Sequence, residues 1–361
     1  MKIFAAISTI SLALLFGGSN VAQAASVPAS NGLIISLTGD VKIRRYSGYI
    51  ITPDMGTYLY PGDQLLATNN SKILVQCNVD LSIISVQGNQ QINTCSQAKC
   101  TEGLARCSRR GDTVAWNEQP IPYLITPRRS KLLNNRPLIR WQSVPGATSY
   151  TLKVRDVKAS KVVWETKIEG TEVVYGGEQT LQENTSYRLI VEAEIDSNTT
   201  ISSTQESERV QSLKLIDGET ATKVNLAKEN IEQQQWDEIT KKLAIANLYL
   251  QDELVSEAVL ILEDLVKNSS ATRAIYRQLG DLYFQKLLLV PQARDYYLRA
   301  LTLSGDLEET TVIQEELSRV YRSLGEKEEA IKWLNLAKAG YESLGDYEQV
   351  EELNQQLKNP Q

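Results

Sequence analysis

The stretch from residue 245 to residue 258, Ile-Ala-Asn-Leu-Tyr-Leu-Gln-Asp-Glu-Leu-Val-Ser-Glu-Ala, decides the fold of the C-terminal third because its pattern returns twice. An aliphatic residue is followed by a small one, then by a tyrosine, and an alanine ends each copy. The matching positions are Ile245, Ala246, Tyr249 and Ala258, then Leu279, Gly280, Tyr283 and Ala293, then Leu317, Ser318, Tyr321 and Ala330. The tyrosines are separated by 34 and then by 38 residues.

From about Gly218 onward, apolar residues recur with the period of 3.6 that is typical of helices. Paired helices with small residues at their contacts and a repeat of 34 residues resemble tetratricopeptide repeats. We expect repeats at about 239–272, 273–307 and 311–344 within an α-helical array spanning 219–361, with a leading helix and a C-terminal cap helix. An unrelated helical bundle is the alternative.

The resemblance implies that the first helix of each pair lines a concave groove that binds a protein partner. An extended peptide or a helix would fit such a groove. The repeat register predicts that its lining residues are Asn247, Leu250, Arg277, Asp281, Phe284, Glu315, Arg319 and Arg322. For each of them, a solvated or structural role is the alternative.

Residues 122–215 predict a second, all-β module. Trp141, the turn Pro145-Gly146 and the strand-like run 187–195 follow in an order that resembles a fibronectin type III or immunoglobulin-like sandwich. In such modules a tyrosine corner is typical, and Tyr187, six residues after Leu181, fits that place.

Residues 31–115 predict a first, small β module, because short β-branched runs alternate with Gly and Pro turns. The stretch Gly39-Asp-Val-Lys-Ile-Arg-Arg45, together with Pro61-Gly-Asp63, resembles the β domain of FecR-type proteins. The cytoplasmic part and membrane helix of those proteins have no counterpart here, so the likeness implies only a fold.

All four cysteines of the chain fall in this first module: Cys77, Cys95, Cys100 and Cys107. If the protein is exported, an even, clustered set predicts two disulfides. Pairing of Cys77 with Cys95 and of Cys100 with Cys107 is favoured because each closes a short loop. A four-cysteine zinc site is the alternative, although the spacing lacks a Cys-x-x-Cys knuckle.

Residues 1–24 predict a cleaved signal peptide: Lys2 precedes an apolar core, and Ala22-Gln23-Ala24 is a small-x-small cleavage site. The expected location is the periplasm or the cell exterior. A buried N-terminal helix is the alternative.

The chain has a net charge of −6, which argues against nucleic-acid binding. A basic strip between residues 106 and 140 departs from this average, with only Asp112 and Glu118 opposing Arg106, Arg109, Arg110, Arg128, Arg129, Lys131, Arg136 and Arg140. We expect it to dock an anionic envelope polymer or membrane surface, or else to be a solvated seam between domains.

Catalysis is not expected, because the chain has no histidine and no phosphate-binding loop. A Ser-x-x-Lys match at residues 96–99 lacks its usual partner motifs, and residues 196–200 lack the glycine and glutamate of a calcium loop. We predict no cofactor and no metal.

The order of modules is similar to that of exported tetratricopeptide-repeat proteins of cyanobacterial type. The prediction is therefore a non-enzymatic scaffold or adaptor in the cell envelope that binds a protein through the repeats. Two alternatives remain: a module that binds polysaccharide or peptidoglycan through the basic strip and β domains, and a FecR-like sensor subunit.

Overall fold

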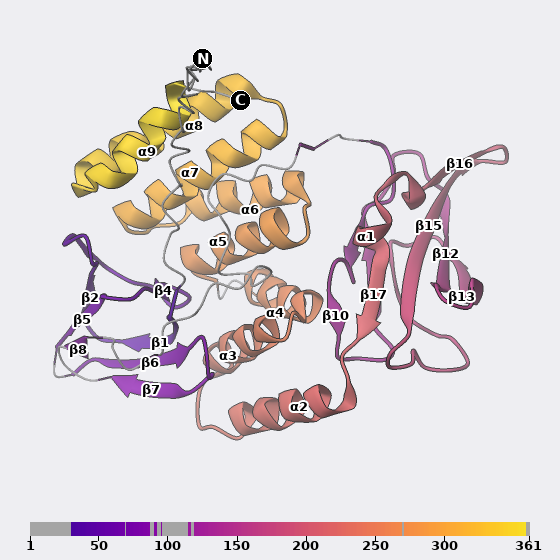
Figure 1. The fold of residues 1–361 in the computed structure, drawn as a ribbon, viewed down its shortest axis with the longest axis horizontal. Coiled ribbons are helices and arrows are strands. Elements are labelled where there is room, and N and C mark those ends of the chain that lie inside the picture. The colour runs from indigo at the N-terminus through magenta and orange to yellow at the C-terminus, as the bar shows by residue number, and fades with distance from the viewer. Residues whose placement is uncertain are drawn as a thin grey trace, which may run out of the picture.

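A computed structural model describes residues 30–68, 70–86, 90–91, 95, 115–116, 119–268 and 271–358. Strands dominate this part of the chain up to residue 215, and helices follow from residue 218 (Figure 1). The predicted order of β modules before an α-helical array is confirmed. Within the described residues, no helix is both long enough and apolar enough to cross a membrane.

The first β domain consists of two antiparallel sheets, ordered β4-β1-β6-β7 and β3-β2-β5-β8. Its core lies between them and includes Ile34, Ile43, Leu65 and Val75, which are all buried. The strands are β1 (Gly32–Thr38), β2 (Val41–Arg44), β3 (Ile50–Ile51), β4 (Tyr58–Leu59), β5 (Gln64–Ala67), β6 (Lys72–Cys77), β7 (Ile83–Val86) and β8 (Gln90–Gln91).

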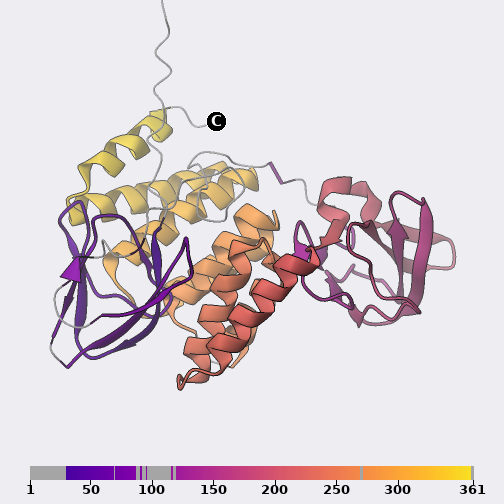
Figure 2. The same cartoon turned by 60° about the horizontal axis from the view of Figure 1, so that its bottom comes forward.

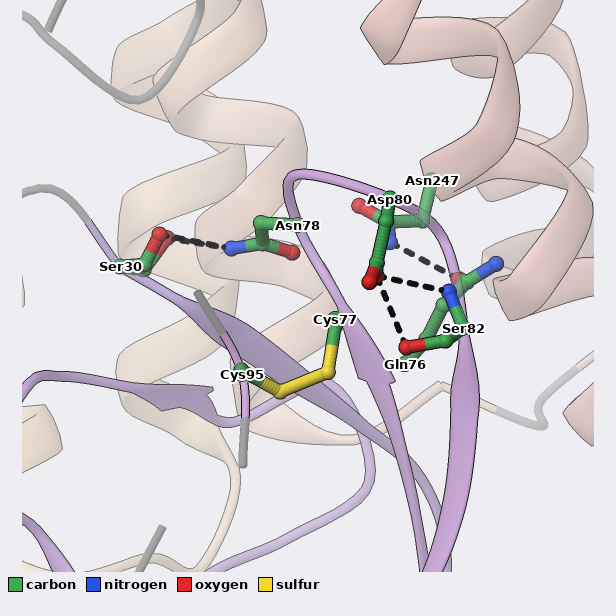
Figure 3. The surroundings of a disulfide bond; sticks show 8 residues. All are labelled: Ser30, Gln76, Cys77, Asn78, Asp80, Ser82, Cys95 and Asn247. Atoms are coloured by element: carbon green, nitrogen blue, oxygen red, sulfur yellow. Dashed lines mark hydrogen bonds between the residues drawn. A yellow bond between two sulfur atoms is a disulfide. The ribbon is translucent and has the colours of Figure 1, made fainter. Parts of the chain in front are cut away.

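A disulfide joins Cys77, the last residue of β6, to Cys95 (Figure 3). This confirms one of the two predicted pairings and removes both sulfurs from the alternative zinc site. Cys100 and Cys107 lie outside the described residues.

The second β domain is a sandwich of sheets β14-β11-β9 and β10-β17-β15-β12-β13, the latter with β16 paired to β15. Trp141 fills its centre with its ring against Tyr150. The hydroxyl of Tyr187 accepts a hydrogen bond from the backbone N–H of Gln182 at 2.9 Å, as a tyrosine corner requires. The elements are β9 (Leu124–Thr126), β10 (Lys131–Leu132), β11 (Leu138–Trp141), β12 (Ser149–Asp156), β13 (Lys161–Ile168), β14 (Glu172–Val174), β15 (Ser186–Asp196), β16 (Thr199–Ser202), the short helix α1 (Glu208–Gln211) and β17 (Ser212–Leu215).

The helical array packs in consecutive antiparallel pairs, α3 with α4, α5 with α6 and α7 with α8. Side-chain oxygens of Asp217, Asp237, Thr272 and Asp306 cap the helices that begin after them. The helices are α2 (Gly218–Glu232), α3 (Glu238–Gln251), α4 (Val255–Lys267), α5 (Arg273–Asp281), α6 (Val290–Thr302), α7 (Leu307–Ser323), α8 (Lys327–Leu344) and α9 (Tyr347–Lys358).

One of the four extra residues between the second and third copies lies after α5, where Ala293 follows Tyr283 by ten residues and not by nine. The helix continues as a π-turn over Leu282–Lys286, in which Leu287 N–H donates to the carbonyl of Leu282. Leu288 then takes a positive φ of 53°, and α6 begins at Val290.

The array separates the two β domains (Figures 1 and 2). The first β domain lies against the first helix of each pair, α3, α5 and α7. The sandwich lies on the other side, where β10 contacts α4. Leu33 and Ile35 of β1 belong to the same buried apolar cluster as the helices of the array, so this contact is part of a shared core.

Candidate functional site

Two of the eight predicted groove residues, Asn247 and Arg277, contact the first β domain. Six of the eight predicted side chains are buried, and Asp281 and Arg322 are half-buried. Asn247 of α3 donates a hydrogen bond from its side-chain amide to the side-chain oxygen of Gln76 in β6, at 2.8 Å (Figure 3). Part of the face that we expected to meet a separate partner therefore meets the chain's own β domain in this structure.

A buried polar cluster of this interface centres on Arg45, which is 7% exposed. Its guanidinium donates two hydrogen bonds to the carboxylate of Glu308 in α7, at 2.9 and 2.8 Å, and one to Asp63 at 2.5 Å. Tyr49 also donates its hydroxyl proton to Glu308, at 2.9 Å. One buried cation thus joins two carboxylates that belong to different domains.

The protonation states in this cluster follow from burial and charge. Burial opposes the charged form of Arg45, but Glu308 and Asp63 outweigh it and raise the pKa of the guanidinium. Burial raises the pKa of Asp63, while Arg45 opposes that shift. Removing the cation would leave two buried carboxylates without their counter-charge.

A second cluster lies on α5, where the β domain supplies backbone oxygens. The side-chain amide of Gln278 donates to the carbonyl of Gly56 at 2.6 Å, and the hydroxyl of Thr272 donates to the carbonyl of Met55 at 2.7 Å. Arg277 lies over the ring of Tyr58, with its guanidinium carbon 5.2 Å from the ring centroid. The turn that precedes β4 is therefore held on the array by side chains of a single helix.

Arg277 also pairs with carboxylates of the array, Glu309 at 2.6 Å and Asp281 at 3.1 Å. Asp281 accepts a further hydrogen bond from the hydroxyl of Tyr297 at 2.7 Å. Burial raises the pKa of Asp281 to about 7. Repulsion from the charge of Glu316 adds to this rise, and the charge of Arg277 opposes it.

This shift predicts a pH dependence of stability. Because the folded chain holds the Asp281 proton more tightly than the unfolded chain, the stabilisation is complete below the ordinary pKa of 3.8 and is lost as the pH rises through about 7. We expect the native protein to lose roughly 2–3 kcal/mol more than Asp281→Asn between pH 5 and pH 8. Urea unfolding at both pH values measures the difference, and equal slopes for the two proteins would contradict it.

The predicted groove residues of the third copy form contacts within the helical array. Arg319 pairs with Glu316 at 2.9 Å and lies over the ring of Phe284, and Glu315 accepts a hydrogen bond from the hydroxyl of Tyr341 at 2.7 Å. Arg322, also of the third copy, donates a hydrogen bond to the side-chain oxygen of Gln356 in α9 at 3.5 Å. Leu250, of the first copy, belongs to the shared apolar core.

The described members of the basic strip lie mostly at the seam between sandwich and array. Arg128 is 1% exposed, pairs with Glu206 and donates to the carbonyl of Leu287. Arg140 pairs with Glu263 at 2.6 Å, Lys131 with Glu253 at 2.7 Å, and Arg136 donates to the carbonyl of Tyr175 at 3.4 Å. Arg129 is exposed, and Arg106, Arg109 and Arg110 lie outside the described residues. These contacts correspond to an interdomain seam rather than to one open basic surface.

Arg45 and Asp63 fall within the FecR-like stretches, but their pairing with each other and with Glu308 was not predicted, although a signal for a buried Arg45 was present. Val41 and Ile43 lie on the buried face of β2, and Arg45, directly after this strand, continues the same alternation in the sequence. A charge on the apolar face of a strand predicts a buried partner. Nothing in the sequence points to a glutamate 263 residues away.

Comparison with known proteins adds no assignment: no family model matches the chain, and no curated protein matches it.

Proposed function

We propose that the protein is a non-enzymatic scaffold or adaptor of the cell envelope, an exported tetratricopeptide-repeat protein with FecR-like and fibronectin-like β domains. Its helical array holds the first β domain on its inner face and the sandwich on its other side. A protein partner then binds surfaces that this assembly leaves exposed.

The observation that carries the proposal is that the first β domain occupies part of the inner face of the helical array. The Arg45–Glu308 pair and the Asn247–Gln76 hydrogen bond are buried, and Leu33 and Ile35 extend the core of the array into the β domain. Separating the first β domain from the array would expose this apolar surface together with buried charges. The free-energy cost of that exposure is high. The β domain is therefore a permanent part of the scaffold.

Large apolar side chains remain exposed on the outer surfaces of the array and the β domain. Ile331 and Leu336 of α8 are 41% and 42% exposed, and Tyr347 at the start of α9 is 72% exposed. Exposed aromatic and aliphatic residues of this kind are common anchors of protein interfaces.

Photo-crosslinking in the native envelope tests the proposal with matched substitutions. Tyr347 and the interfacial Tyr58 are each replaced by p-benzoylphenylalanine in the full chain. We expect crosslinks to a separate protein from position 347 and crosslinks within the chain from position 58. A separate protein captured from position 58, or none captured from position 347, would contradict the proposal.

A further inference from the structure

A cleft of about 390 Å³ lies at the seam between the sandwich and the array. The sandwich contributes the loop before β10 and the strand β17, and the array contributes the start of α4 and the π-turn. Its volume is within the range of small-molecule sites, roughly 300–1,000 Å³.

The charges around this cleft are unbalanced. Four cations line it, Arg129, Lys131, Lys214 and Lys286, against the single carboxylate of Glu253. Glu253 is engaged by Lys131 at 2.7 Å. Counted over the described lining residues alone, cations outnumber carboxylates by three, in a protein whose net charge is −6, and Lys286 also interacts with a further group.

The fold itself places two of these cations side by side. In the parallel pairing of β10 with β17, Lys131 is the direct partner of Lys214, and Leu132 is the partner of Leu215. The two leucines are buried, so the two lysines share the outward face. Like charges directly opposite each other destabilise a sheet unless an anion lies between them or near them.

Arg129, which also lines this cleft, has a strained backbone conformation. Its φ of 46° lies in the left-handed region, which costs a residue other than glycine about 1 kcal/mol or more. The side chain of Arg129 is exposed in part, and the burial of the rest lowers the pKa of its guanidinium, to which repulsion from Arg128 and Arg209 adds. The chain thus holds an arginine in an unfavourable conformation beside other cations, among the residues that line the cleft.

We propose that this cleft binds a small ligand with two or more oxyanion groups, phosphate or carboxylate, through Arg129, Lys131, Lys214 and Lys286. Arginine forms paired hydrogen bonds with both kinds of group, and the lysines act as point charges on either side. The described lining of this site includes Leu250 of the predicted groove but no residue of the first β domain, and its ligand is separate from the protein partner of the scaffold.

Calorimetric titration of the full chain tests the site with two probes, tripolyphosphate and trigalacturonate, which separate phosphate from carboxylate recognition. We expect at least one probe to bind with a 1:1 stoichiometry and an affinity that falls as sodium chloride is raised from 20 to 200 mM. The double variant Arg129→Asn, Lys214→Gln should weaken that binding at least tenfold. Asparagine is chosen at position 129 because it tolerates the left-handed conformation.

The matched control is Lys158→Gln, Lys161→Gln, which removes two exposed charges from the β12–β13 hairpin of the same sandwich. It should bind the probe as the unmodified chain does. Lys214→Gln alone keeps Arg129 and should give an intermediate loss, which guards against a folding defect in the double variant. No binding of either probe at 20 mM salt, or an equal loss in the control, would overturn the inference.

Discussion

Replacing Arg45 by methionine is expected to lower the free energy of unfolding by about 3–5 kcal/mol, which is the usual cost of removing one partner of a buried ion pair. Methionine preserves most of the side-chain length but leaves Asp63 and Glu308 without their shared cation. Side chains of these two acids are 1% and 10% exposed, so water cannot replace the guanidinium. Urea unfolding of the full chain, followed by circular dichroism, measures the loss.

Arg44→Met is the matched control. Arg44 is the neighbouring residue, its side chain is exposed, and its contact is a hydrogen bond of 3.4 Å to Gln64. Because exposed substitutions usually change stability by less than about 0.5 kcal/mol, this variant should unfold as the native chain does. An Arg45→Met chain as stable as Arg44→Met would show that the two domains do not depend on the buried pair.

Gly280→Ala should destabilise the array by about 2 kcal/mol, although alanine is the better helix former by about 1 kcal/mol. A methyl group at this position would lie 2.5 Å from a ring carbon of Tyr297, a side chain with no exposed surface. The ring cannot move freely, because its hydroxyl donates a hydrogen bond to Asp281. Overpacking therefore outweighs the gain in helix propensity.

Gly170→Ala provides the control for this second substitution. A methyl group at position 170 would meet no atom within 4 Å, and that residue's φ lies outside the left-handed region. We expect thermal unfolding to show a lowered midpoint for Gly280→Ala and an unchanged one for Gly170→Ala. A stabilised Gly280→Ala chain would mean that the helices at this crossing are further apart than the structure has them.

Local features of this chain were predictable from its sequence. The helix-forming repeats, the hydrogen bond between Tyr187 and Gln182 and the bond between Cys77 and Cys95 each involve residues fewer than 40 positions apart. Patterns over such distances report directly on helix faces, turns and short loops.

The contacts between domains were not predictable, since they join distant charges. A count of cations marks Arg128 as part of a basic surface, yet its partner Glu206 is 78 residues away and leaves it buried. The repeat register likewise identifies Asn247 as facing inward but does not reveal that Gln76 covers it. Occupation of the inner face depends on the shape of a separate domain, which periodicity does not describe.

The rate of thiol labelling at position 247 tests most directly whether the β domain covers the inner face of the array. An Asn247→Cys chain is compared with Leu226→Cys, whose native side chain is 58% exposed on α2, while that of Asn247 is 3% exposed. Mass spectrometry follows a maleimide reagent under native conditions, and the unmodified chain corrects for its own cysteines. We predict labelling at position 247 at least a hundredfold slower than at position 226; equal rates would contradict the covered face.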